Sequence, residues 1–218
     1  MAKIVWDEVG KRIYETGVDR CVLYVSGDDG YGNGVAWNGL TGVTESPSGA
    51  EASAIYANNG KYLNLYSAEE FGATIKAYTY PPEFEVCDGT ASIATGVKIG
   101  QQARKSFAFT YRTLIGNDVD GTEKGYKIHL VYGAMAAPSE KDYATVNDSP
   151  EAIEFSWEVS TTPVEVDSNH KATSVITIDS TEVDPAKLKS LEDTLYGTTE
   201  KEPKMPTPAE VVSMFSAA

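Results

Sequence analysis

The clearest pattern in the chain is an alternation of apolar and polar residues near the end of the stretch from Gly125 to Pro163. Every second position of the run 153–160 is apolar, namely Ile153, Phe155, Trp157 and Val159. The positions between them hold Glu154, Ser156, Glu158 and Ser160. A period of two is typical of a strand that is buried on one face. The run 125–132 repeats this pattern less strictly, with Ile128, Leu130 and Tyr132 opposite Lys127, His129 and Val131.

These two runs predict two strands of one sheet. The connection between them, 136–152, is polar and too long for a tight hairpin, so we interpret it as a contact between subunits. The run 153–160 carries no catalytic group, and together the two runs suggest a sheet built for assembly.

The segments before the two runs also favour strands and turns. An apolar run predicts a strand over 21–26, and the glycine-rich segment 27–34 predicts a flexible hairpin turn. Residues 34–46 resemble a second strand that glycines interrupt. Residues 46–66 mix Ser, Ala, Asn and Gly with little periodicity, which indicates a long loop or a splayed hairpin arm. In an assembling protein, such a segment would be a contact arm.

Further strands follow along the chain. Residues 75–80 alternate until Pro81 and Pro82, which lack an amide donor and must end any strand ladder. Phe107, Phe109 and Tyr111 share one face of a predicted strand, and residues 117–125 form a hairpin turn after it. A last short strand is expected around 175–178.

Three segments have the signals of helices. Ser67 and Glu70 form a capping box, which predicts a short helix over 67–75. Asp184 is a suitable N-cap for a second helix, which Gly197 would end. Its start and apolar stripe are marked by Pro185, Leu188, Leu191 and Leu195.

The third helix follows a linker at 198–206. Thr207 and Glu210 form its capping box, and Val211, Val212 and Phe215 make its apolar side. A helix this short cannot fold alone, so it must dock on its own chain or on another. We therefore expect a domain over 1–180, a helix packed on it at 181–197, and a linker with a C-terminal arm or helix at 198–218.

Composition and charge narrow the possible functions. The chain has 218 residues, of which 41% are hydrophobic and 23% charged, as in an ordinary globular protein. It carries 18 Lys and Arg against 32 Asp and Glu, a formal charge of −14, so it should bind phosphate backbones poorly. The same charge would suit a passage through which a polyanion slides without sticking, although plain solubility explains it equally well.

Cysteine usage and the absence of long apolar runs indicate where the protein resides. Cys21 and Cys87 are far apart and show no CxxC or His spacing, which favours buried free thiols over a metal site or a disulfide framework. The first fifteen residues carry charges throughout, and no run approaches the roughly 18 apolar residues of a membrane helix. We expect a protein that is made and kept in a cytoplasm, without a membrane segment.

Three apparent signals of chemistry fail on inspection. Gly30, Gly32 and Gly34 are spaced as in a phosphate loop, but Val35 and the residues after it supply neither the Lys-Ser/Thr pair nor a helix. A calcium loop with Gly121 at its sixth position would lack acidic ligands at both ends. His129 and His170 have no partner at motif spacing, so His129 is expected to be a surface or interface imidazole. We expect no enzyme, cofactor or metal.

Several segments of the sequence resemble those of one protein family. Residues 125–164, together with 35–51, 64–84 and 170–197, are similar to segments of the major tail proteins, also called tail tube proteins, of long-tailed bacteriophages with non-contractile tails. The resemblance spans most of the chain and contains no catalytic signature.

This resemblance implies a mainly β fold: a β-sandwich or barrel-like subunit with a flanking α-helix and a short C-terminal helical extension. Subunits of the family form hexameric rings that stack into a tube, with strand edges paired inside each ring. DNA would pass through an acidic lumen without specific binding. The implied partners are further copies of the chain, a tape measure protein, and tail terminator or tip proteins. The implied location is the virion, after assembly in the host cytoplasm.

The candidate site residues follow from this picture. Glu154 and Glu158 share a polar strand face and are candidates for the lumen lining, although a shift of one residue in register would place them outside. Candidates for contacts between subunits or rings are Ser46, Tyr56, Asn59, Tyr62, Tyr143, Val211 and Phe215. The alternative function is a tail-associated β-sandwich module that recognises a host glycan or receptor through tyrosine-rich loops.

Overall fold

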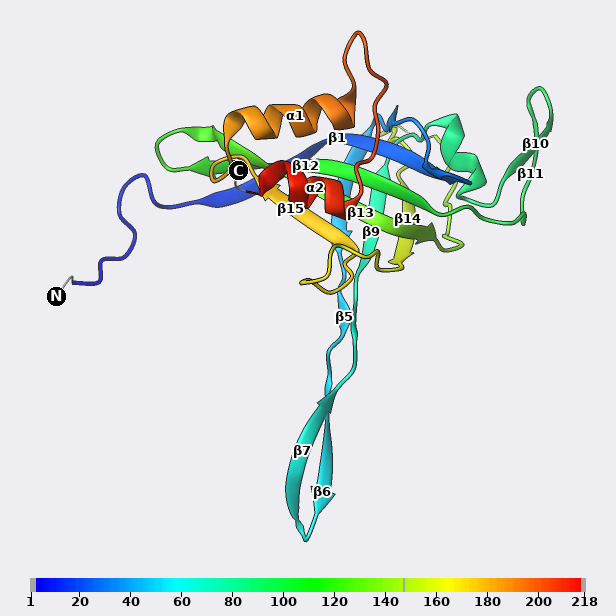
Figure 1. The fold of residues 1–218 in the computed structure, drawn as a ribbon. Helices are drawn as coiled ribbons and strands as arrows, with labels where there is room; N and C mark the ends of the chain where they lie inside the picture. The colour runs from blue at the N-terminus through cyan, green and yellow to red at the C-terminus, as the bar shows by residue number, and fades with distance from the viewer. Residues whose placement is uncertain (1–2, 147, 217–218) are drawn as a thin grey trace.

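The computed structural model describes residues 3–146 and 148–216. It shows a curved antiparallel sheet with two helices on one side and a long hairpin projecting from the body (Figure 1). The strands are β1 (Tyr14–Gly27), β2 (Gly30–Tyr31), β3 (Val35–Ala36), β4 (Leu40–Glu45), β5 (Ser48–Gly49), β6 (Ala52–Ala57), β7 (Gly60–Tyr66), β8 (Glu69–Glu70), β9 (Gly72–Ala77), β10 (Ala91–Ala94), β11 (Val97–Ile99), β12 (Phe107–Asn117), β13 (Gly121–Ala136), β14 (Phe155–Thr161) and β15 (Val175–Asp179). The helices are the 3-10 helix η1 (Pro82–Val86) and the α-helices α1 (Pro185–Tyr196) and α2 (Pro208–Phe215).

The main sheet has the strand order β2-β1-β12-β13-β14-β9-β4, with β15 also paired to β13 and β3 to β1. Strand β13 organises it, because one edge of β13 pairs with β12 while the other pairs first with β15 and then with β14. Gly133 lies where the partner changes. Its φ is +60°, and a Cβ atom there would lie 2.2 Å from the carbonyl oxygen of Thr162. Only glycine fits this turn of the strand.

The first core lies between the two halves of the curved sheet. Strands β1, β12 and β13 contribute Leu23, Phe107, Phe109 and Val131 from one side, and β9 and β14 contribute Ile75, Trp157 and Val159 from the other. The rings of Trp37, Phe84 and Trp157 meet at its centre, with centroids 4.5 to 5.4 Å apart. Apolar area from two facing half-sheets is the basis of a β-sandwich, and the predicted mainly β, sandwich-like fold is confirmed.

The second core lies on the opposite face of β1, β12, β13 and β15, beneath the two α-helices. Ile128, Leu130 and Tyr132 of β13 pack there against Leu188, Leu191 and Leu195 of α1 and Val211 of α2. Consequently β13 is buried on both faces, whereas the outer face of β14 is polar. The predicted surface position of His129 is therefore wrong. His129 is 8% exposed, and its imidazole stacks on Tyr111 with the ring centroids 4.5 Å apart.

The predicted termini of α1 and α2 are confirmed. The Asp184 side chain accepts hydrogen bonds from the backbone N–H groups of Ala186 and Lys187, and Thr207 and Glu210 form a complete capping box. Helix α2 packs on its own chain, which decides between the two docking partners left open above.

The helix predicted over 67–75 is wrong, because this segment forms β8 and β9. A capping box is a local signal, whereas β9 gains a complete ladder on each side from β14 and β4. The alternating burial of Ala73, Ile75 and Ala77 then overrides the local preference. The open interpretation of 46–66 is settled in favour of a hairpin arm, since β6 pairs with β7.

Candidate functional site

The most unusual feature of the surface is the β6–β7 hairpin, which extends far from the body (Figure 1). Asn58 and Asn59 form its turn with φ angles of 49° and 63°, the left-handed geometry of a two-residue hairpin. Tyr56 and Tyr62 lie next to this turn and are 70% and 71% exposed. Because a two-stranded ribbon has no core of its own, its large apolar side chains face solvent on both sides.

The root of the hairpin is fixed to the sandwich. The N–H of Ser46 donates to the carbonyl of Gly72 at 2.8 Å, and β5 pairs with β8 immediately beyond. At Gly49, φ is +83° and a Cβ atom would lie 2.1 Å from the carbonyl oxygen of Ala68, so the crossing of the two strands needs glycine. The hairpin is thus a supported arm with an unsupported tip.

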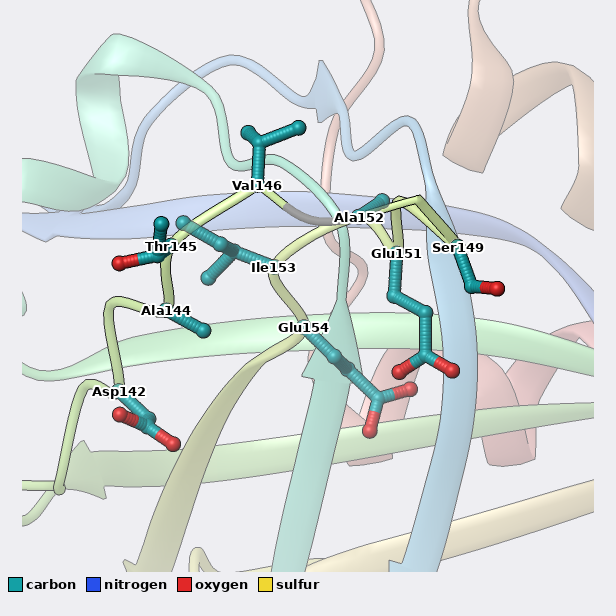
Figure 2. Close-up of a pocket in the computed structure, with 9 residues that line it drawn as sticks. All are labelled: Asp142, Ala144, Thr145, Val146, Ser149, Glu151, Ala152, Ile153 and Glu154. Atoms are coloured by element: carbon teal, nitrogen blue, oxygen red, sulfur yellow. The ribbon is translucent and has the colours of Figure 1, made fainter.

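The second feature is the polar face of β14, which is covered by acidic side chains. Glu154 and Glu158 are exposed, and Glu140 and Asp142 of the 137–154 connection line the same depression. Figure 2 shows Asp142 and Glu154 with Glu151 around the adjoining pocket. We call the five residues Glu140, Asp142, Glu151, Glu154 and Glu158 the acidic face. Lys76 of β9 pairs with Glu154 at 3.6 Å, so part of the charge of the face is neutralised.

The 137–154 connection is tied to the body through Asp88. This carboxylate is 7% exposed and lies 2.6 Å from Nζ of Lys141 and 3.6 Å from Nη1 of Arg104. The same Nη1 donates to the carbonyl of Ala136 at 3.1 Å. Lys141 also lies over the ring of Tyr80, 5.8 Å from its centroid. These bonds hold the start of the connection, and with it Glu140 and Asp142, against η1.

A cluster of polar side chains joins β4 to the centre of the sheet. The hydroxyl of Tyr111 donates to Glu45, and His129 Nδ1 lies 3.6 Å from the same carboxylate. Thr113 contacts His129 Nε2 at 3.0 Å. Burial lowers the pKa of His129, although the nearby carboxylate of Glu45 opposes that shift. The stacking on Tyr111 and these polar contacts enclose the imidazole at the centre of the sheet.

The two cysteine thiols are enclosed as well. Both cysteines are free and buried, and burial raises the pKa of the Cys87 thiol to about 12 and also raises that of Cys21. Among residues 3–146 and 148–216, no group of three or more His, Cys, Asp or Glu side chains is arranged to hold a metal ion. Within the same ranges, no helix is long and apolar enough to cross a membrane.

The structure brings some of the predicted site residues together and separates others. Tyr56, Asn59 and Tyr62 meet at the tip of the arm, while Ser46 lies at its root. Glu154 and Glu158 lie together on the acidic face.

The remaining predicted contact residues lie apart from the arm. Tyr143 belongs to the 137–154 connection and is 70% exposed. Val211 is 4% exposed inside its own chain, so it offers little surface to a partner, and Phe215 is partly buried beside it.

Sequence reasoning did not find Glu140, Asp142 and Glu151 of the acidic face. The recurrence of acidic residues through 140–158 was the available signal, but it does not show that the connection folds back beside β14. Asp88 was also missed, because its partners Lys141 and Arg104 are distant in the sequence.

Comparisons with known proteins give distant structural similarity. No family model matches the sequence, and no curated protein matches it. A chain from the six-fold symmetrised baseplate of the anti-feeding prophage is similar with a TM-score of 0.38 and 8% identity, covering 83% of this chain and all of that one. A chain from the sheath-tube complex of an extracellular contractile injection system, in the extended state, has a TM-score of 0.32 and 16% identity, covering 73% and 88%. Both TM-scores are below 0.5, so this likeness does not by itself define the role of the chain.

Proposed function

We propose that this protein is a structural subunit of a phage tail or phage-like particle, which self-assembles into hexameric rings that stack into a tube. The tube conducts the genome, and the subunit has no catalytic role. The observation that carries the proposal is the β6–β7 arm, a long ribbon with exposed tyrosines and no core. Such a ribbon is marginal in isolation and is stabilised when a partner covers it.

The edge of the sheet supports assembly as well. Strand β4 ends the strand order and pairs with β9 on one side, and among the described residues no strand is hydrogen-bonded to its other edge. Exposed edges pair with other chains unless they are blocked. In the proposed ring, each β4 edge is paired by the next subunit, and the repeated contact closes with six-fold symmetry.

The acidic face supports the conduit. In the proposed tube, Glu154 and Glu158 look into the lumen, where carboxylates repel the phosphates of DNA. Screening limits this repulsion to about 8 Å at physiological ionic strength, so it prevents adhesion without obstructing a wide channel. The formal charge of −14 agrees with passage rather than binding.

Negative-stain electron microscopy of the purified protein over a range of protein and salt concentrations tests the proposal. We expect rings or tubes for the wild type and none for the Tyr56→Ala/Tyr62→Ala variant, because each lost tyrosine removes about 1–2 kcal/mol of contact energy. Tyr78→Ala is the matched control, since Tyr78 is 53% exposed outside the arm. A wild-type protein that stays monomeric throughout would contradict the proposal. If that monomer bound glycans on an array, the receptor-binding alternative would replace it.

A further inference from the structure

The N-terminal segment before β1 is a second apolar extension of the molecule. Ile4, Val5, Trp6 and Val9 are all at least 60% exposed, and we call residues 3–9 the N-terminal arm. Four large apolar side chains within six positions exceed the scattered exposure that is normal for a protein surface. The carboxylate of Asp7 lies among them, and no ion pair joins it to another described residue.

The body of the protein directs this arm outward. The N–H of Gly10 donates to Asp118 at 2.9 Å, and the side-chain amide of Asn117 donates back to the carbonyl of Gly10 at 3.2 Å. Asn117 is itself 3% exposed in the β12–β13 turn. Beyond this fixed point, residues 3–9 extend away from the sheet and from α2 (Figure 1). At about 3.3 Å per residue they reach up to roughly 23 Å, which is far enough to meet another molecule.

An apolar groove lies elsewhere on the same chain, between β15 and α2. It encloses about 550 Å³, and its floor and walls include Val166, Ile176, Ile178, Val212 and Phe215. Lys171 stands at its edge and forms no ion pair with a described residue. The size and lining of the groove match a site for one large apolar side chain and its neighbours.

The groove accepts side chains rather than an added strand. The N–H of Val175 is bonded to the hydroxyl of Thr173 at 3.3 Å, and the carbonyl of Asp179 accepts from Glu182 and Val183. Both ends of the outer edge of β15 therefore already have partners, which leaves little length for an added strand. An extended segment that docks here gains its affinity mainly from apolar contacts and charge.

We propose that the N-terminal arm of one subunit docks in the β15–α2 groove of a second copy, with Trp6 in the groove and Asp7 opposite Lys171. Two observations select this occupant. The arm and the groove are both apolar and lie on different parts of the chain, and each carries an unpaired charge of the sign that the other needs. Such a contact is heterologous, so it propagates from copy to copy and closes into a ring or continues as a filament. The inference rests on the proposed role as an assembling subunit.

Tryptophan fluorescence can follow this contact in the full-length protein. Trp6 is 76% exposed, whereas Trp37 and Trp157, the other two tryptophans, are 3% and 0% exposed. Association should therefore shift the Trp6 emission to the blue and protect it from acrylamide, and a Trp6→Phe variant should show neither change. Emission that is already shifted in dilute monomer would mean that the arm occupies its own groove, which overturns the proposal.

A charge exchange tests the pairing itself. Asp7→Lys and Lys171→Asp should each weaken association by about tenfold or more, because each places like charges together. The double variant should recover most of the wild-type affinity. Asp29→Lys is the matched control, a reversal on the exposed β1–β2 turn that should leave association unchanged.

The outcomes separate this inference from the proposed function. If rings or tubes form with unchanged Trp6 emission, or if the double variant does not recover, the N-terminal arm is not the contact, while the tube proposal stands. If the wild type does not associate at any concentration, both fall.

Discussion

Replacing Asp88 by Asn should loosen the 137–154 connection and destabilise the fold. The substitution keeps the size of the side chain and removes its charge. Lys141 and Arg104 would then each lose an anionic partner. Their side chains are only 28% and 23% exposed. A partly buried cation without an anionic partner lowers the free energy of unfolding, since water cannot fully replace the carboxylate.

The magnitude follows from this partial burial. Breaking a fully buried ion pair costs about 3–5 kcal/mol, while an exposed pair contributes about 0–1 kcal/mol. Asp88 is nearly buried but both cations still reach solvent, so we expect a loss of about 1–3 kcal/mol. For a chain of this length, each kcal/mol corresponds to a shift in Tm of about 2–4 °C. Asp88→Asn should therefore lower the Tm by about 2–12 °C.

Urea unfolding and calorimetry measure this loss, with Asp193→Asn as the matched control. Asp193 pairs with Lys189 at 2.8 Å, a distance similar to that of the Asp88–Lys141 pair, but their side chains are 41% and 72% exposed. Its substitution should leave the Tm unchanged within error. Hydrogen exchange should rise at residues 137–146 in Asp88→Asn alone. Equal effects of the two substitutions would refute the argument that burial sets the value of the ion pair.

A double-mutant cycle adds a second check. Lys141→Met removes the cation that Asp88→Asn leaves unpaired, so the double variant should be less destabilised than the sum of the two single losses. Strict additivity would mean that Asp88 and Lys141 do not interact in solution.

Three further predictions concern other parts of the fold. Burial lowers the folded-state pKa of His129 below the ordinary 6.5. The stability that the neutral imidazole contributes should therefore be complete above pH 6.5 and should decrease as the pH falls below it. Urea titrations at several pH values should show a weaker dependence of the unfolding free energy on pH for His129→Gln. Gly133→Ala should cost more than about 1–2 kcal/mol, measured by Tm, whereas Gly42→Ala, with open space at its Cβ position, should stay within about 0.5 kcal/mol. In assembled particles, Glu154→Lys/Glu158→Lys should slow genome ejection or trap DNA, and an unchanged rate would place both residues outside the lumen.

The sequence was sufficient for the elements whose signals are local and strong. The α1 stop at Gly197, the capping box of α2 and the alternation around Trp157 each depend on residues within one element, and all three match the structure. The segment 67–75 has an equally clear local signal and fails. Its ladder partners lie on β4 and β14, and pairing with distant strands outweighs a helix cap of about 1 kcal/mol.

The candidate site was less predictable, because it depends on which faces of the sheet are covered. Periodicity could not show that β13 has a core on each side, and so it placed His129 at the surface. It could not show that the connection 137–154 folds beside β14 either, because the Asp88–Lys141 pair joins residues 53 positions apart.

The distribution of the two cores explains where a partner can bind. The helices cover β1, β12 and β13 on one face, and on that side the groove between β15 and α2 stays open. Strands β14, β9 and β4 pack on the first core with one face, and the outer face of β14 carries the acidic face. Charge of one sign disfavours close contact between two such faces, so we expect this face to look onto solvent. In the proposed assembly, association then uses the apolar extensions, the β15–α2 groove and the β4 edge. A subunit that joins others through its edges and arms, and keeps a charged face free, is suited to enclosing a water-filled channel.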